Sequence, residues 1–104
     1  TVQAKDFSFN GTKPAIIIDV RTADEFASGH IEGALNIPYE QIGQGIQSVK
    51  GLSKDSPVLL YCRSGRRSAI ARATLEKQGF KNILDGGGID SLAQTLKPCT
   101  AKTC

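Results

Sequence analysis

The sequence predicts an α/β domain with a mostly parallel central sheet and helices on both faces. Its 104 residues suffice for a single domain with one modest hydrophobic core. Two mostly apolar runs, Ala15–Val20 and Val58–Cys62, lack the polar alternation of a half-exposed strand, so both are expected to be buried strands. Helical patterns alternate with these runs, which favours parallel strands joined by crossover helices.

The chain is divided here into a lead-in segment (residues 1–14), a folded domain (15–97) and a tail (98–104). Phe7 and Phe9 of the lead-in segment are expected to pack onto the domain.

The first strand is followed by Thr22-Ala23-Asp24-Glu25, which has the pattern of a capping box. This pattern predicts a short helix that runs through Ser28 and stops at Gly29. A second short strand is expected at residues 34–37, closed by Pro38, with the Asn36 side chain bonded to the backbone.

In the second half, a helix is predicted at 39–49, although Gly43 and Gly45 disfavour it. A helix at 68–78 is expected to turn Ile70, Ala73 and Leu75 toward the core. The remaining predicted elements are a strand at 81–84, a turn at 86–88 and a helix from about residue 89 to residue 96.

Charge and hydropathy exclude several classes of protein. A net charge of +3 is too small to indicate a nucleic-acid partner. The apolar runs are far shorter than the roughly 20 residues that span a bilayer, so no membrane partner is expected. Four of the five arginines lie between residues 63 and 72, which favours an anion site over the alternative, a solvated helix face.

Three cysteines are present, Cys62, Cys99 and Cys104, together with one histidine, His30. This set contains no zinc constellation of normal spacing, so no metal site is expected. The odd count leaves at least one thiol without a partner within the chain. No signal peptide is visible, which leaves open a cytoplasmic chain or a processed mature form.

The segment Cys62-Arg63-Ser64-Gly65-Arg66-Arg67-Ser68 lies between a buried strand and a helix start. A tight loop at this place directs backbone N–H groups inward and forms an anion cradle, and Gly65 allows the sharp turn. The N–H groups and the arginines would lower the pKa of the Cys62 thiol and make it a nucleophile. The alternative is a buried, inert cysteine.

Three stretches resemble the single-domain rhodanese family of sulfurtransferases: Ile18–Arg21 with Glu25-Phe26, Gly29–Pro38, and Leu60–Ser68 with Gly86-Gly87. The resemblance extends over residues 15–96 and is nearest to the periplasmic phage-shock-type rhodaneses. It implies a rhodanese-like fold and an enzyme that carries sulfur as a Cys62 persulfide, with no cofactor. The donor would be thiosulfate or polysulfide, and the acceptor cyanide or a thiol.

The six-residue loop Cys62–Arg67 resembles that of sulfurtransferases, since the related phosphatases would have arginine where this chain has Ser68. Residues 63–68 are expected to bind the substrate: Arg63, Ser64, Gly65, Arg66, Arg67 and Ser68. A second interpretation is a persulfide carrier that serves a partner enzyme without useful turnover of its own.

Asp19 and Arg21 resemble a family pair near the mouth of the active site, and a supporting ion pair is the favoured interpretation. His30 is expected to support the fold. Cys99 and Cys104 form a C-x4-C tail, for which a disulfide and two separate thiols are equally favoured. A disulfide would require an oxidising compartment, which agrees with a periplasmic location; a cytoplasmic location is the alternative.

Overall fold

The computed structural model describes residues 7–95 and 97–98. Its centre is a four-stranded sheet in the order β3-β2-β4-β5, in which every neighbouring pair is parallel. The strands are β2 (Ile16–Asp19), β3 (Leu35–Asn36), β4 (Val58–Cys62) and β5 (Ile83–Gly88). The α/β class and the parallel sheet predicted from the two apolar runs are therefore confirmed.

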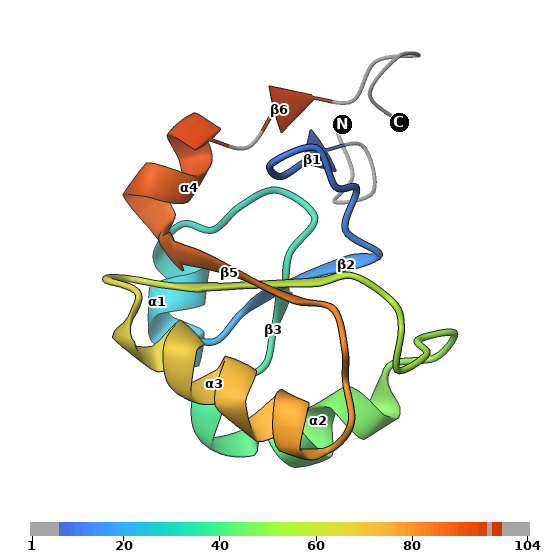
Figure 1. Cartoon of the computed structure of the whole chain (residues 1–104). Helices are drawn as coiled ribbons and strands as arrows, with labels where there is room; N and C mark the ends of the chain where they lie inside the picture. The colour runs from blue at the N-terminus through green and yellow to red at the C-terminus, as the bar shows by residue number, and fades with distance from the viewer. Residues whose placement is uncertain (1–6, 96, 99–104) are drawn as a thin grey trace.

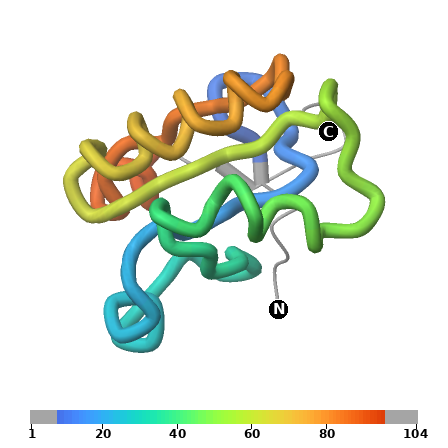
Figure 2. Tube along the Cα trace, turned by 90° about the horizontal axis from the view of Figure 1, so that it is seen from below, coloured from blue at the N-terminus to red at the C-terminus, as the bar shows by residue number. Residues whose placement is uncertain are grey.

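Helices cover both faces of this sheet (Figure 1). On one face, α3 (Arg66–Lys77) packs beside α2 (Ile42–Gly45), which the short 3-10 helices η2 (Tyr39–Gln41) and η3 (Ile46–Ser48) flank. Figure 2 shows this layer from below. On the other face lie α4 (Ile89–Thr95) and an antiparallel pair of short strands, β1 (Phe7–Ser8) and β6 (Lys97–Pro98). This strand pair joins the lead-in segment to the other end of the chain.

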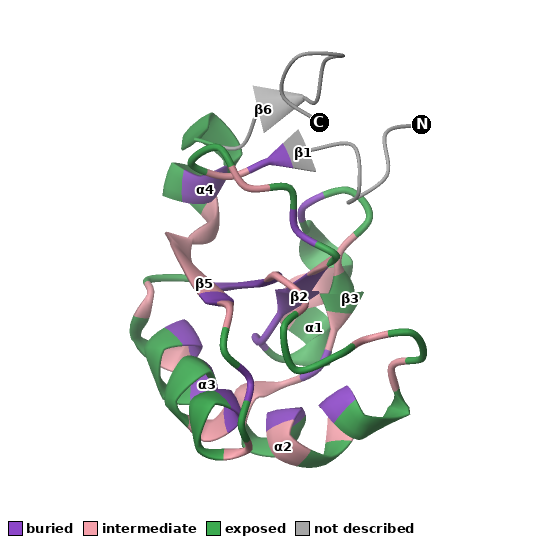
Figure 3. Cartoon of the chain, turned by 45° about the vertical axis from the view of Figure 1, so that its right-hand side comes forward, coloured by how far each residue is buried: buried purple, intermediate pink, exposed green. Residues whose placement is uncertain are grey.

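Successive residues of β2 and β4 point to opposite faces, so both strands are buried on both sides. Ile18 and Leu60 belong to the cluster beneath α2 and α3, while Ile17 and Leu59 belong to the cluster that includes Leu92 of α4. All of these side chains are inaccessible to solvent. Figure 3 shows buried residues on the inner sides of the helices and exposed residues on their outer sides. Phe9 packs against the α4-side cluster, as expected.

The helix α1 (Ala23–Ser28) follows β2 and begins with the predicted capping box. The Thr22 hydroxyl accepts from the Glu25 N–H, and the Glu25 carboxylate accepts from the Thr22 N–H. Gly29 ends the helix. This part of the chain folds as its local sequence predicts, because both halves of the cap are supplied within four residues.

Three sequence predictions are wrong in detail. The segment 39–49 forms three short helical pieces rather than one helix. The glycines at 86–88 lie within β5 and not in a turn. In α3 the face toward the sheet consists of Ser68, Ala71 and Leu75, whereas Ala73 and Ile70 are exposed. Small residues at 68 and 71 allow the helix to approach the sheet closely, and this approach decides which stripe is buried.

In the part of the chain that the structure describes, no helix has the length and apolar character needed to cross a bilayer.

Leu75 and Ile70 test the assignment of the buried face. Leu75→Ala should lower the free energy of unfolding by about 2–5 kcal/mol, because it leaves a cavity between α3 and the sheet. Ile70→Ala should change it by less than about 1 kcal/mol, since the Ile70 side chain is 43% exposed. Urea denaturation of both variants measures the difference. Equal losses would mean that Ile70 is part of the core.

Candidate active site

The carboxyl ends of β2 and β4 lie side by side and place Asp19 and Cys62 at one edge of the sheet. After Cys62 the chain makes a three-residue loop, Arg63-Ser64-Gly65, and enters α3 at Arg66. Gly65 precedes the helix with φ of +98°, a left-handed conformation that L residues rarely adopt. The loop therefore turns back over the end of β4 and brings the first turn of α3 onto the Cys62 sulfur.

The Cys62 sulfur is enclosed by this loop. Its Sγ atom accepts a hydrogen bond from the Gly65 N–H at 2.8 Å, and the Ser68 hydroxyl lies at 3.7 Å. Burial would raise the pKa of the Cys62 thiol, but the N–H groups of Ser68, Gly65 and Ser64 and the Ser68 hydroxyl outweigh it and lower the pKa below its ordinary value. The cradle predicted from the sequence is therefore present around the sulfur.

The glycines of β5 allow the loop to sit against the sheet. A Cβ atom at Gly88 would lie 2.7 Å from the Arg63 carbonyl oxygen, and one at Gly86 would lie 2.9 Å from the Leu60 carbonyl oxygen. Both are closer than real Cβ contacts, and the obstructing atoms are backbone. These glycines thus keep the loop and β4 close to β5.

The clustered arginines have different surroundings. Arg63 and Arg66 are exposed at the loop and at the helix start. Arg67 is half-buried and binds the Glu25 carboxylate through both Nη atoms, at 2.7 Å and 3.0 Å. Arg72 binds Glu76 at 3.3 Å on the outer side of α3. Of the four clustered arginines, Arg67 and Arg72 are therefore bound to glutamates, whereas Arg63 and Arg66 form no ion pair with the described residues.

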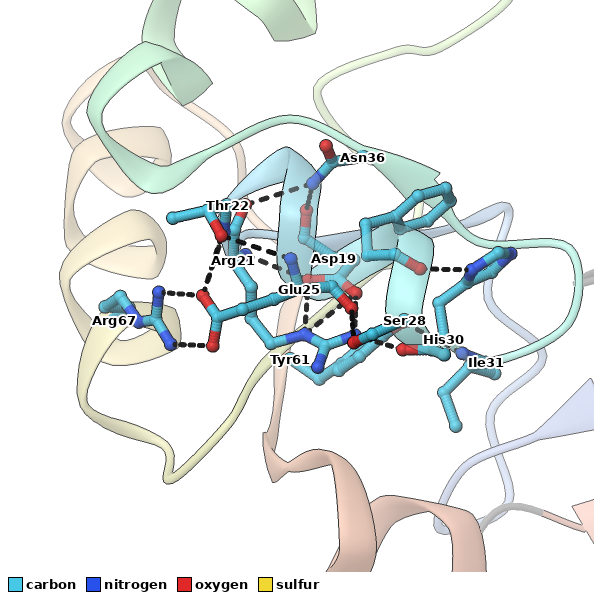
Figure 4. A network of polar contacts seen from close by, with 12 residues as sticks. Asp19, Arg21, Thr22, Glu25, Ser28, His30, Ile31, Asn36, Tyr61 and Arg67 are labelled. Atoms are coloured by element: carbon cyan, nitrogen blue, oxygen red, sulfur yellow. Dashed lines mark hydrogen bonds and ion pairs between the residues drawn. The ribbon is translucent and has the colours of Figure 1, made fainter.

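Glu25 joins α1 to the first turn of α3, a role that the capping-box pattern alone did not reveal (Figure 4). The Arg67 guanidinium, helped by the Thr22 N–H and hydroxyl, lowers the pKa of Glu25 from its ordinary 4.5 to about 2. In turn, Glu25 raises the pKa of Arg67, and the Cys62 sulfur contributes to that increase. Arg67 is therefore a permanent cation close to the candidate nucleophile.

Asp19 and Arg21 form a buried ion pair rather than a part of the cradle. The Asp19 carboxylate accepts from Arg21 Nε at 3.0 Å and from Nη2 at 2.7 Å, and also from the Arg21 backbone N–H. The Arg21 Nη2 also donates to the Gly29 carbonyl oxygen at 2.6 Å. No hydrogen bond of the described residues joins this pair to the Cys62 loop. Its surroundings agree with the supporting role predicted for it.

Two other predicted supports are confirmed. Asn36 Nδ2 donates to the carbonyl oxygens of Asp19 and Arg21, both at 3.0 Å, and so binds β3 to the end of β2. The His30 ring stacks on Phe26, and its Nδ1 lies 2.8 Å from the Phe26 carbonyl oxygen. His30 therefore holds the end of α1. The predicted tail pair Cys99 and Cys104 lies outside the described residues.

Asp85 is the residue of the site that sequence reasoning missed. Its Oδ1 atom accepts from the Ser68 hydroxyl at 2.7 Å and from the Gly87 N–H at 3.0 Å. In the sequence, Asp85 precedes three glycines and indicates only a turn. Its position beside the loop depends on the pairing of β5 with β4, which no local pattern reveals.

A parallel sheet that delivers one cysteine into a cradle of N–H groups defines a class of cysteine-dependent α/β proteins. The chain belongs to the rhodanese-like domain family, which it matches over residues 4–91. Two relatives are the thiosulfate sulfurtransferase PspE of Escherichia coli and a sulfurtransferase of Allochromatium vinosum. The first is 32% identical over 73% of this chain and 72% of its own length; the second is 37% identical over 86% and 82%.

A solved structure described as a rhodanese with anions from E. coli has the same fold. Its sequence is 31% identical, the TM-score is 0.71, and the match covers 75% of this chain and 91% of that one. The chain spans less of some other relatives: 58% of a protein from Schizosaccharomyces pombe and 60% of one from Bacillus subtilis. The fold expected from the resemblance is therefore confirmed.

The ion pair between Glu25 and Arg67 predicts a pH dependence of stability. Because the pKa of folded Glu25 is lowered to about 2, its contribution is complete above pH 4.5 and is lost as the pH falls toward 2. The difference in free energy of unfolding between wild type and Glu25→Gln should follow that course. Denaturation at several pH values measures it, with Asp24→Asn as the control. A difference that does not change with pH would contradict the ion pair.

Proposed function

We propose that the protein is a sulfurtransferase that takes the sulfane sulfur of thiosulfate or polysulfide onto Cys62 and passes it to cyanide or a thiol. The observation that carries the proposal is the enclosed Cys62 sulfur, which accepts from the Gly65 N–H at 2.8 Å and has a lowered pKa. The family membership and the names of the relatives support it.

In the first step, the Cys62 thiolate attacks the outer sulfur of thiosulfate. A bond forms between the two sulfur atoms, the S–S bond of thiosulfate breaks, and its electron pair leaves with sulfite. The product is a Cys62 persulfide anion, whose charge the N–H groups of the loop are suited to stabilise. Exposed Arg63 and Arg66 offer guanidinium groups to the sulfonate oxygens of the donor.

In the second step, the acceptor attacks the outer sulfur of the persulfide. With cyanide the products are thiocyanate and the Cys62 thiolate, which takes the electron pair of the breaking S–S bond. With cyanide as the acceptor, neither step requires a separate base once the thiolate has formed, because each nucleophile and each leaving group is an anion that gains or loses no proton. A cofactor is therefore unnecessary for either step.

A persulfide carrier is the second candidate. A Bacillus subtilis relative that is 36% identical over 69 residues has the words "sulfur carrier protein" in its name. The Cys62 residue is inaccessible to solvent, which would protect a stored persulfide from small acceptors. Steady-state turnover of thiosulfate and cyanide supports the enzyme, whereas loading without turnover supports the carrier. The periplasmic location stays a prediction.

Incubation with thiosulfate should increase the intact mass of the protein by one sulfur atom, and cyanide should remove it. Cys62→Ser should show no gain, because the atom that forms the persulfide is replaced. Cys99→Ala/Cys104→Ala should retain both the gain and its removal, because Cys62 takes up the sulfur and cyanide accepts it directly, with no second thiol. Mass spectrometry of the intact chain measures all three. A sulfur atom on the Cys62→Ser variant would place the nucleophile elsewhere.

Arg66→Ala should lower kcat/KM for thiosulfate by about tenfold, or roughly 1.4 kcal/mol, which is a normal loss for one charge-assisted contact. The loss should shrink with an uncharged sulfur donor and at high salt. Arg72→Ala is the matched control, because Arg72 has the same charge on the same helix but binds Glu76. Equal losses for charged and neutral donors would show that Arg66 supports the shape of the loop.

A further inference from the structure

A chain of contacts links the Cys62 sulfur to an acid on the neighbouring strand. The sulfur lies 3.7 Å from the Ser68 hydroxyl oxygen, which donates to Asp85 Oδ1 at 2.7 Å. Ser68 is inaccessible to solvent, so no bulk water competes for these contacts. Neither the capture of sulfur nor its release, as described above, assigns a role to Asp85.

The carboxylate of Asp85 is fixed by the irregular pairing of β4 with β5. Leu60 pairs with Asp85, but Cys62 pairs with Gly88, so β5 contains an extra residue at this point. Gly87 adopts φ of +72°, and its N–H donates to the same Oδ1 that accepts from Ser68. The irregularity therefore holds the carboxylate against α3.

The Ser68 hydroxyl has one proton and faces three groups that compete for it: the Asp85 carboxylate, the Gly65 carbonyl oxygen at 3.0 Å and the Cys62 sulfur. The shortest contact is to Asp85, whose carboxylate is a stronger acceptor than a carbonyl oxygen. The Asp85 carboxylate therefore competes with a Cys62 thiolate for the one proton of the hydroxyl. This competition weakens the hydrogen bond that the hydroxyl donates to the sulfur, without removing it.

We infer that Asp85 is a positioning residue that acts on the Cys62 nucleophile through Ser68, by competing with the Cys62 thiolate for the one proton of the Ser68 hydroxyl. The nucleophilic role of Cys62 rests on the proposed function. Asp85 opposes the loop N–H groups and keeps part of the Cys62 population as thiol. The reactivity of Cys62 is thus a balance between the cradle and this acid.

Other charged groups face the same sulfur from the elements around it. Arg67 of α3 lies close enough to interact electrostatically, but its guanidinium is bound to Glu25 of α1. Arg63 and Arg66 are exposed, and Asp19 of β2 is paired with Arg21. Asp90, the acid on α4 next to β5, is also exposed. Apart from Asp90, which is changed only in its own control variant, these groups remain unchanged in the variants below and contribute equally to each titration.

The test is the pH titration of Cys62 in Cys99→Ala/Cys104→Ala, where it is the single cysteine, followed by the ultraviolet absorbance of the thiolate. Asp85→Asn keeps an oxygen for Ser68 and Gly87 but removes the charge. It should lower the pKa of Cys62 by about one unit, or about tenfold in the ratio of thiolate to thiol. Ser68→Ala should raise that pKa, because a thiolate loses its hydroxyl donor.

The two variants should thus shift the pKa of Cys62 in opposite directions. A purely structural role would disturb the cradle in both variants and shift this pKa in the same direction. In the Ser68→Ala background, Asp85→Asn should produce less than half of its original shift. Asp90→Asn is the control: it changes the net charge equally and should leave the titration unchanged. If Ser68→Ala does not fold, as judged by thermal melting, the comparison of Asp85→Asn with Asp90→Asn still tests the inference, and Asp85→Ala similarly replaces Asp85→Asn.

The inference is overturned if Asp85→Asn leaves the pKa of Cys62 unchanged, or if its shift is the same with and without the Ser68 hydroxyl. The titration reads the thiolate directly and needs no sulfur donor. A protein that fails to take sulfur from thiosulfate, yet shows the opposite shifts, would disprove the proposed function and leave the role of Asp85 intact. For an active enzyme, the acid limb of kcat/KM should move with the same pKa.

Discussion

The buried ion pair between Asp19 and Arg21 is the interaction on which the arrangement of this edge of the sheet depends. It occupies the end of β2, and the same arginine reaches the carbonyl oxygen of Gly29 after α1. Asn36 of β3 binds the carbonyl oxygens of both residues. Beside them, the Tyr61 hydroxyl of β4 accepts from the Ile31 N–H. A buried charge without its partner is strongly unfavourable, so each member of the pair requires the other, and together they connect β2, the end of α1 and β3.

A second ion pair, between Glu25 and Arg67, connects this edge of the sheet to the helix that follows the active-site loop. Glu25 caps α1, whose start is fixed by the end of β2, and its carboxylate holds the first turn of α3. From the other side, the glycines of β5 admit the loop against the sheet, and Asp85 holds Ser68. The cradle around Cys62 is therefore positioned from α1 and from β5. This arrangement explains how a three-residue loop with exposed side chains can direct its N–H groups at one sulfur atom.

The chemistry of the site follows from opposing effects on one thiol. Burial disfavours the Cys62 thiolate, while the N–H groups of the loop favour it more strongly, so the pKa is lowered. The same groups that stabilise a thiolate suit a persulfide anion, and this is why a sulfur-transfer role fits the geometry without a histidine base. His30, the single histidine, is occupied in holding the end of α1 against Phe26.

Features that depend on neighbours along the chain can be predicted from the sequence of this protein. The sequence predicted the two buried strands, the capping box at Thr22, and the cysteine loop at the carboxyl end of a strand, because apolar runs, caps and turns are encoded within a few residues. Three other features became known from the folded protein alone: Ala71 and not Ile70 faces the sheet, Arg67 is bound to Glu25, and Asp85 reaches Ser68. These contacts join residues from different elements. They depend on the close packing of α3 on the sheet and on the irregular pairing of β4 with β5. Neither of these leaves a periodic pattern in the sequence.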